Sequence, residues 1–177
     1  MKKYRYLAKI GLFELLLITF DQISKYWATI RLKGKNDFDI IKDVLSLHYL
    51  DGGNTGAAWG MLSGKIIVFI IFTIFAIIVI AKFMWNTYRL LKRTNKLSIK
   101  ILNLSLALLM AGAIGNLIDR IIHGYVIDFI YFKLINFPIF NVADCYVTVS
   151  CVLIIIICAF KLNEEEFNYI LSLKKEE

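Results

Sequence analysis

Residues 125–144 read YVIDFIYFKLINFPIFNVAD and connect the last two of four long apolar runs. This stretch carries two carboxylates, Asp128 near its start and Asp144 at its end. Around Asp128 the sequence is rich in β-branched and aromatic residues, which predicts a short strand or an extended loop. Carboxylates at the mouth of a membrane bundle are costly to keep there, so the pair indicates a functional site. We expect the rest of the chain to hold these two side chains in place.

The composition indicates a membrane protein rather than a soluble one. The chain has 177 residues, of which 59% are hydrophobic and only one is proline, whereas soluble domains are about half apolar. Its length suits a single domain, 1–177. The net charge of +7 does not predict nucleic-acid binding, because the basic residues cluster between apolar runs, where membrane topology accounts for them. The three cysteines lack the spacing of a metal site or a disulfide framework, so we expect them to pack.

The apolar runs predict four transmembrane helices, at about residues 6–27, 66–85, 97–122 and 140–161. Basic residues precede the first run, separate the second from the third and follow the fourth, which predicts that both termini are cytoplasmic. The first run begins like a signal peptide, but no small-x-small cleavage site follows it, so we expect an uncleaved helix. The outer loops would then be about 28–65 and 120–139.

The two predicted outer loops carry signals for a small sheet. Val44–Leu50 alternates between apolar and polar residues, which is typical of a strand. A glycine-rich turn, LDGGNTGAAWG, follows at 50–60 and leaves room for close backbone approach. Tyr125–Phe132 supplies a further extended segment in the other loop. The predicted fold class is therefore an all-α polytopic membrane protein with a small sheet on its outer side.

The polar residues of the chain fall in one layer near the predicted outer interface. They come from five separate places: Asp21, Lys25, Asn54, Asn116, Asp119, Arg120, Asp128, Asn141 and Asp144. A polar cluster at membrane depth indicates function by default. Two carboxylates that share a site cannot both ionise cheaply, so one keeps a proton. That arrangement predicts the chemistry of aspartic proteases, which needs no metal, thiol or other cofactor.

Most of these residues also have a purely structural interpretation. Asn141 and Asp144 fit the N-cap and N3 positions of a capping box. An asparagine in a glycine-rich turn, such as Asn54, often serves only the turn. Neighbouring residues of opposite charge predict structural ion pairs, namely Asp21 with Lys25 and Asp119 with Arg120.

Asp128 favours a functional interpretation, because it lies among apolar residues without a local partner. Glu14 lies deep in the first run, where it either pairs with Lys25 or a group on another helix, or keeps a proton; the sequence leaves these options open. A different class of function, a proton-coupled transporter or channel subunit, would spread polar groups through the membrane depth. A third, an assembly or chaperone subunit, would use the cluster only to lock the helices together.

Five motifs, in this order and spacing, give the chain a resemblance to a known family. They are DQISK at 21–25, NTGAAWG at 54–60, AGAIGNLIDR at 111–120, GYVIDF at 124–129 and FNVAD at 140–144. With these motifs the chain resembles lipoprotein signal peptidase, the type II signal peptidase of bacteria. The resemblance runs from about residue 21 to residue 159.

The resemblance implies an architecture and a reaction. It implies four transmembrane helices with both termini cytoplasmic, a small extracytoplasmic β-cradle, and a location in the cell membrane of a bacterium. Its aspartyl dyad would be Asp128 and Asp144. The substrate would be a diacylglyceryl-modified prolipoprotein, cut just before the lipidated cysteine.

The resemblance also assigns roles to the residues around the dyad. Substrate binding would fall to Asn54, Gly56, Asn116, Arg120 and Asn141. Structural support would fall to Asp21, Lys25 and Asp119. Implied partners are membrane lipid and a globomycin-type inhibitor, with no metal, no cofactor and no nucleic acid.

Overall fold

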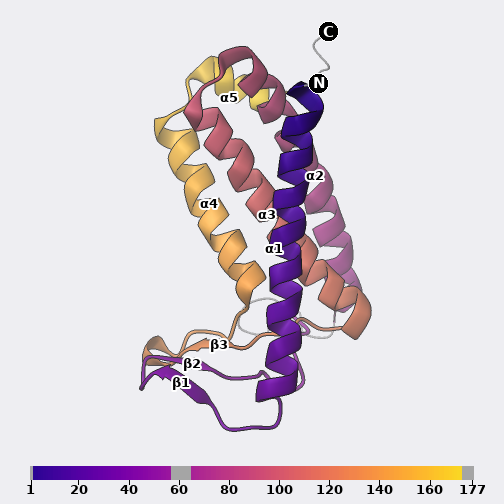
Figure 1. The fold of residues 1–177 in the computed structure, drawn as a ribbon, viewed down its shortest axis with the longest axis vertical. Helices are drawn as coiled ribbons and strands as arrows, with labels where there is room; N and C mark the ends of the chain where they lie inside the picture. Colours follow the sequence, from indigo (N-terminus) through magenta and orange to yellow (C-terminus); the bar gives the residue numbers. More distant parts are fainter. Residues whose placement is uncertain (1, 57–64, 173–177) are drawn as a thin grey trace.

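The computed structural model describes residues 2–56 and 65–172, which fold into a helical bundle with a small sheet at one end. The four long helices are α1 (Lys2–Leu32), α2 (Ile66–Thr94), α3 (Leu97–His123) and α4 (Val142–Phe160). Figure 1 shows these helices side by side, with the start of α1 at the end opposite the sheet. The bundle therefore has a sheet end and an opposite end.

Within the described residues, three helices have the length and the apolar composition to cross a membrane, namely α2, α3 and α4. They contain the runs predicted at 66–85, 97–122 and 140–161. Among the three, α3 is the most buried, since it packs against α1, α2 and α4. The run predicted at 6–27 lies within α1, a helix of 31 residues, and its membrane crossing stays a prediction.

Two helices continue further than the apolar runs predicted. α2 extends to Thr94, so the basic residues expected in a connecting loop, Arg89, Lys92 and Arg93, lie on its last turns. Residues 66–94 contain no glycine or proline, and the helix ends where Asn95 adopts a left-handed φ of 51°. Likewise, Arg120 lies in the last turn of α3 rather than in an outer loop.

The small sheet predicted from the two outer loops is confirmed. Its strands β1 (Phe38–Ile41), β2 (Leu45–Leu47) and β3 (Ile130–Phe132) are antiparallel in the order β1-β2-β3, and the 3-10 helix η2 (Lys133–Ile135) follows. Isolated bridges join Asn54 to Val126 and Ile130 to Phe140. The glycine-rich motif 54–60 is described only as far as Gly56, since residues 57–64 lie outside the described ranges. The sheet thus ties the turn at Asn54 and the start of α4 to the segment that carries Asp128.

A further helix, α5 (Glu164–Leu171), lies in the charged segment that follows α4. Asn163 and Glu166 form a capping box that starts it. Lys96 contacts Glu166 at 2.6 Å, and the Asn86 amide donates to the Ile170 carbonyl at 2.9 Å. These contacts fasten α5 over the turn between α2 and α3, far from the sheet. Tertiary packing stabilises this helix, which at 8 residues is too short to persist alone.

Candidate active site

Asp128 and Asp144 border the same cavity, of about 580 Å³, at the sheet end of the bundle. Asp128 lies two residues before the start of β3, and Asp144 lies in the first turn of α4. Four other predicted site residues border this cavity: Asn54, Gly56, Asn116 and Arg120. These polar residues come from segments that are distant in the sequence, and they gather in one place, as the sequence analysis predicted.

Asp128 is buried, with 1% of its surface exposed. One carboxylate oxygen accepts a hydrogen bond from Asn54 Nδ2 at 2.9 Å, and the other accepts one from Asn141 Nδ2 at 2.7 Å. Burial, and next the nearby charge of Asp144, raise the pKa of Asp128 to about 7. Asp128 is therefore suited to keep a proton at neutral pH.

Asp144 belongs to the capping box that the sequence predicted. Its backbone N–H donates to Asn141 Oδ1 at 3.0 Å, and its carboxylate accepts from the Asn141 backbone N–H at 3.1 Å. Its other carboxylate oxygen accepts from Asn116 Nδ2 at 2.8 Å. The N-terminal end of a helix favours negative charge, so this position suits an ionised carboxylate.

Two asparagines connect the two aspartates. The buried side chain of Asn141 donates to Asp128 and also to Asn116 Oδ1, at 3.1 Å. Asn116 in turn donates to Asp144. The side chain of Asn141 thus caps α4 and also reaches Asp128.

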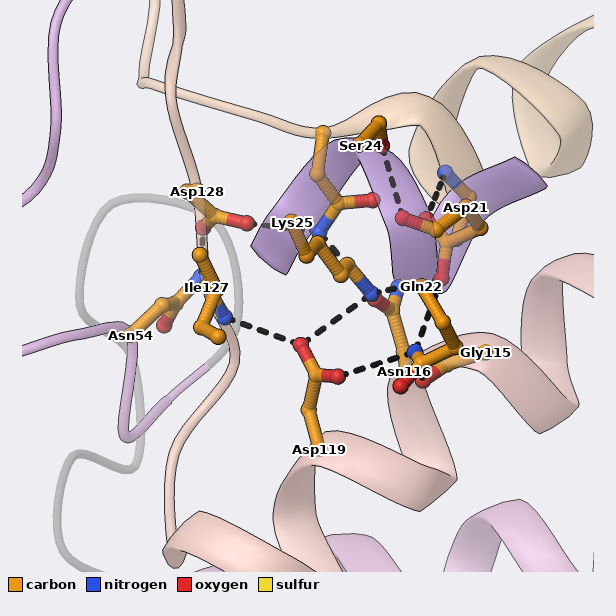
Figure 2. A network of polar contacts seen from close by, with 12 residues as sticks. Asp21, Gln22, Ser24, Lys25, Asn54, Gly115, Asn116, Asp119, Ile127 and Asp128 are labelled. Carbon is orange, nitrogen blue, oxygen red and sulfur yellow. Dashed lines mark hydrogen bonds and ion pairs between the residues drawn. The ribbon is translucent and has the colours of Figure 1, made fainter. Parts of the chain in front are cut away.

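Behind the cavity, Lys25 is enclosed by acceptors from two helices (Figure 2). Its ammonium group contacts Asp21 Oδ2 at 2.9 Å and Asp119 Oδ2 at 3.1 Å, and donates to Asn116 Oδ1 at 3.0 Å. The side chains of all three charged residues are at most 2% exposed. The predicted pairing of Asp21 with Lys25 is confirmed.

The predicted ion pair between Asp119 and Arg120 is wrong for the described residues. Asp119 pairs with Lys25 across the helix interface, because adjacent side chains of a helix point about 100° apart. Arg120 lies over the ring of Phe69, 5.2 Å from its centroid, and borders the cavity. Its Nε is buried without a hydrogen-bond partner in the described ranges.

The two carboxylates beside Lys25 also hold the backbone next to each aspartate. Asp119 accepts from the N–H of Ile127 at 3.0 Å, one residue before Asp128 (Figure 2). Asp21 accepts from the N–H of Ala143 at 3.0 Å, one residue before Asp144. One buried ion cluster therefore fixes both aspartate-bearing segments from the same side.

Sequence reasoning missed Gln22 as a member of this cluster. Its Nε2 donates to Asp119 at 3.0 Å and to the Gly115 carbonyl at 3.2 Å. Its place inside the DQISK motif was the available signal. Glu14 does not join Lys25, whose ion pairs among the described residues are those with Asp21 and Asp119. Glu14 Oε1 is buried without a hydrogen-bond partner in the described part of the chain.

The chain is similar to known proteins over most of its length. A family model described as Signal peptidase (SPase) II matches residues 13–160. A lipoprotein signal peptidase of Clostridium tetani is 42% identical over 142 residues, covering 78% of this chain and 85% of that protein. One of Staphylococcus epidermidis is 39% identical over 163 residues, covering 88% of this chain and 92% of that protein.

A solved structure has the same fold. It is described as a bacterial membrane enzyme and matches with a TM-score of 0.73 at 33% identity, covering 97% of this chain and 95% of that one. Fold, site and relatives together define a bacterial membrane peptidase. More particularly, the chain belongs to the signal peptidase II family.

Proposed function

We propose that this protein is an aspartic endopeptidase that removes the signal peptide from diacylglyceryl-modified prolipoproteins, cutting just before the lipidated cysteine. The observation that carries this proposal is the pair of Asp128 and Asp144, joined through Asn141 and Asn116 at the wall of one cavity. Membership of the signal peptidase II family supplies the reaction class.

Two carboxylates with one proton between them suffice for peptide hydrolysis. Asp144, at a helix N-terminus, accepts a proton from water while the oxygen of that water attacks the scissile carbonyl. Asp128, with its raised pKa, donates its proton to the carbonyl oxygen. The roles reverse as the tetrahedral intermediate collapses, so Asp144 protonates the departing amine and Asp128 recovers the hydroxyl proton. Water and peptide are consumed, and both carboxyl groups return to their starting state.

The remaining polar residues divide into those at the cavity and those behind it. Binding of the substrate main chain or lipid is proposed for Asn54, Gly56, Asn116, Arg120 and Asn141. Support of the site is proposed for Asp21, Lys25 and Asp119, whose side chains hold the backbone beside the dyad. Membrane lipid and a globomycin-type inhibitor are the other proposed partners of this cavity.

The proposed topology has four crossings within one integral membrane domain, 1–177. α1 is the additional crossing, since it runs along the same bundle as the three helices of spanning composition (Figure 1). Both termini are then cytoplasmic, and the sheet and the cavity are at the outer face of the bacterial cell membrane. The basic residues at the opposite end of the bundle support this orientation.

A cleavage assay tests the proposed dyad. The purified protein in detergent receives a diacylglyceryl-modified prolipoprotein, and the mobility shift on a gel reports cleavage. Asp128→Asn and Asp144→Asn are expected to stay folded and inactive. Asp39→Asn, which changes an exposed carboxylate on the sheet, is the matched control and should cleave normally. Thermal unfolding of each variant separates lost chemistry from lost structure.

Two outcomes would contradict the proposal. Cleavage by folded Asp128→Asn or Asp144→Asn would remove the dyad assignment and leave the family membership intact. A folded wild-type protein that cleaves neither modified nor unmodified substrate would favour the transporter class, to be tested as proton flux in liposomes.

A further inference from the structure

The side-chain amide of Asn54 donates to the buried carboxyl group of Asp128. Its Nδ2 lies 2.9 Å from one carboxylate oxygen (Figure 2), whereas Asn141 donates to the other oxygen. Asn54 Oδ1 accepts from the backbone N–H of Gly56 at 3.0 Å, so both ends of the amide have a partner. The position of Asn54 therefore bears directly on the proposed reaction.

Asn54 follows a turn that depends on glycine. Gly52 and Gly53 adopt left-handed φ values of 84° and 67°, a region that residues with a side chain rarely occupy. Directly after them, Asn54 and Val126 exchange two backbone hydrogen bonds of 2.9 Å each. The turn thus brings Asn54 to the segment that carries Asp128.

The ring of Tyr125 occupies the space beside Gly53. A Cβ placed on Gly53 would lie 2.7 Å from Tyr125 Cε2 and closer still to Cδ2 and Cγ, far inside the contact distance of two carbon atoms. At Gly52, by contrast, a Cβ would have nothing within 4 Å. Residue 53 is therefore constrained by the aromatic ring as well as by its φ angle, whereas residue 52 is constrained by φ alone.

Tyr125 is itself anchored to the bundle. Its half-buried side chain packs against the buried cluster that contains Ala28 and Leu32, at the end of α1, and Tyr49. Side-chain hydrogen bonds join Tyr49 to Tyr125 and to Thr29 of α1. The ring is thus a fixed surface against which the turn packs.

We propose that Tyr125 is a positioning residue, whose ring packs on Gly53 and thereby holds the amide of Asn54 against Asp128. Gly53, Asn54 and Asp128 are among the described residues that border the cavity, and Tyr125 is not. Tyr125 therefore acts through the turn rather than on the substrate. This inference rests on the proposed function, because it assigns the contact a purpose in the reaction of the dyad.

The hydrogen bond from Asn54 has a measurable effect on Asp128. It favours the charged form, so it opposes the rise in the pKa of Asp128 that burial and the charge of Asp144 cause. Withdrawal of the amide should therefore raise this pKa further above about 7. The expected shift is roughly one pH unit, the size that the loss of one hydrogen bond to an ionised carboxylate gives.

The pH dependence of cleavage by full-length variants tests the proposal. Gly53→Ala overlaps the ring and Tyr125→Ala removes it, so each should lower kcat/KM about tenfold at pH 7. In both, the decline of kcat/KM at high pH should begin about one pH unit higher than in the wild type. The double variant should shift no further, because both changes break the same contact. Either single variant decides the test if the other fails to fold.

Two control variants separate the ring contact from other causes. Gly52→Ala places a side chain at a left-handed φ in the same turn without a neighbour within 4 Å. It should melt at a lower temperature but keep the wild-type pH profile. Tyr125→Phe retains the ring and should also keep that profile.

Denaturant unfolding at several pH values reports the pKa of Asp128 without substrate. In Gly53→Ala and Tyr125→Ala, the range in which the free energy of unfolding decreases with pH should extend to about 8. This readout tests the contact even if the cleavage reaction is absent. A wild-type protein that does not cleave would therefore contradict the proposed function alone.

Two results would overturn the inference. Lower melting temperatures with unchanged pH profiles in Gly53→Ala and Tyr125→Ala would show that the contact only stabilises the fold. Equal pKa shifts in Gly52→Ala and Gly53→Ala would assign the effect to backbone strain rather than to the ring.

Discussion

The side-chain amide of Asn141 donates a 2.7 Å hydrogen bond to Asp128, while the oxygen of the same side chain caps the helix that carries Asp144. One asparagine thus orients both proposed catalytic residues. A serine at this position retains an N-cap oxygen but loses the amide. The two tasks of Asn141 are therefore separable by substitution.

We predict that Asn141→Ser lowers kcat/KM about 10–100-fold, the effect of losing one hydrogen bond to a carboxyl group that becomes charged when it gives up its proton in the reaction. Its thermal stability should change little, whereas Asn141→Ala should lose about 1 kcal/mol more because the cap is gone. Asn163→Ala is the control, since it removes the equivalent capping box of α5, far from the cavity. A normal rate for folded Asn141→Ser would show that the amide does not serve the reaction.

The raised pKa of Asp128 predicts how activity depends on pH. Burial and the charge of Asp144 raise this pKa to about 7, and the proposed reaction requires one proton on the pair. We expect kcat/KM to fall as pH rises past about 7, approaching tenfold per pH unit, with an apparent pKa that belongs to the pair. A rate that stays level to pH 9 with the same substrate would contradict a shared proton.

The same group predicts the pH dependence of stability. Between the unfolded pKa near 3.8 and the folded value of about 7, the folded protein holds a proton that the unfolded chain has released. The contribution of Asp128 to the free energy of unfolding therefore decreases as pH rises through this window and is constant above it. Asp128→Asn should flatten this part of the profile, measured by denaturant unfolding at fixed detergent. An unchanged profile would mean that Asp128 is not the group that titrates.

Removal of Lys25 is predicted to destabilise the fold. Lys25→Met leaves Asp21 and Asp119 buried without their cation, at a cost of about 3–5 kcal/mol. Lys133→Met is the matched control, because Lys133 also contacts two carboxylates but at an exposed site, where water screens the charges. Thermal unfolding of both variants gives the comparison. Equal decreases in melting temperature for Lys25→Met and Lys133→Met would contradict the prediction that the buried ion pairs cost more to break.

The close packing of α3 against α4 gives a further prediction. A Cβ at Gly112 would lie 2.7 Å from the carbonyl oxygen of Ala143, the residue before Asp144. Gly112→Ala should therefore cost about 1–3 kcal/mol and lower the cleavage rate by displacing the start of α4. Gly11→Ala has no neighbour within 4 Å and should be neutral or gain up to about 1 kcal/mol from helix propensity. Similar losses of melting temperature in both variants would exclude a packing cause.

Some contacts were predictable because they depend on local spacing. The pair of Asp21 and Lys25 and the capping box of Asn141 and Asp144 link residues four and three positions apart, where helix geometry brings side chains together. The apolar runs predicted the three helices of spanning composition because burial in lipid requires about 20 apolar residues in succession. The helix ends were less predictable, as the extension of α2 to Thr94 shows, because polar helical turns lack the apolar signal.

By itself, the sequence determined the apolar helices, the small sheet and the layer in which the polar residues gather, since hydrophobicity and spacing act along the chain. Only the tertiary structure decided that Asp119 pairs with Lys25 rather than with Arg120, that Gln22 joins them, and that α5 folds over the turn between α2 and α3. It also decided that Asp21 and Asp119 hold the N–H groups beside Asp144 and Asp128. These contacts join residues from 8 to 122 positions apart, and the directions of side chains on separate elements are fixed only when those elements pack.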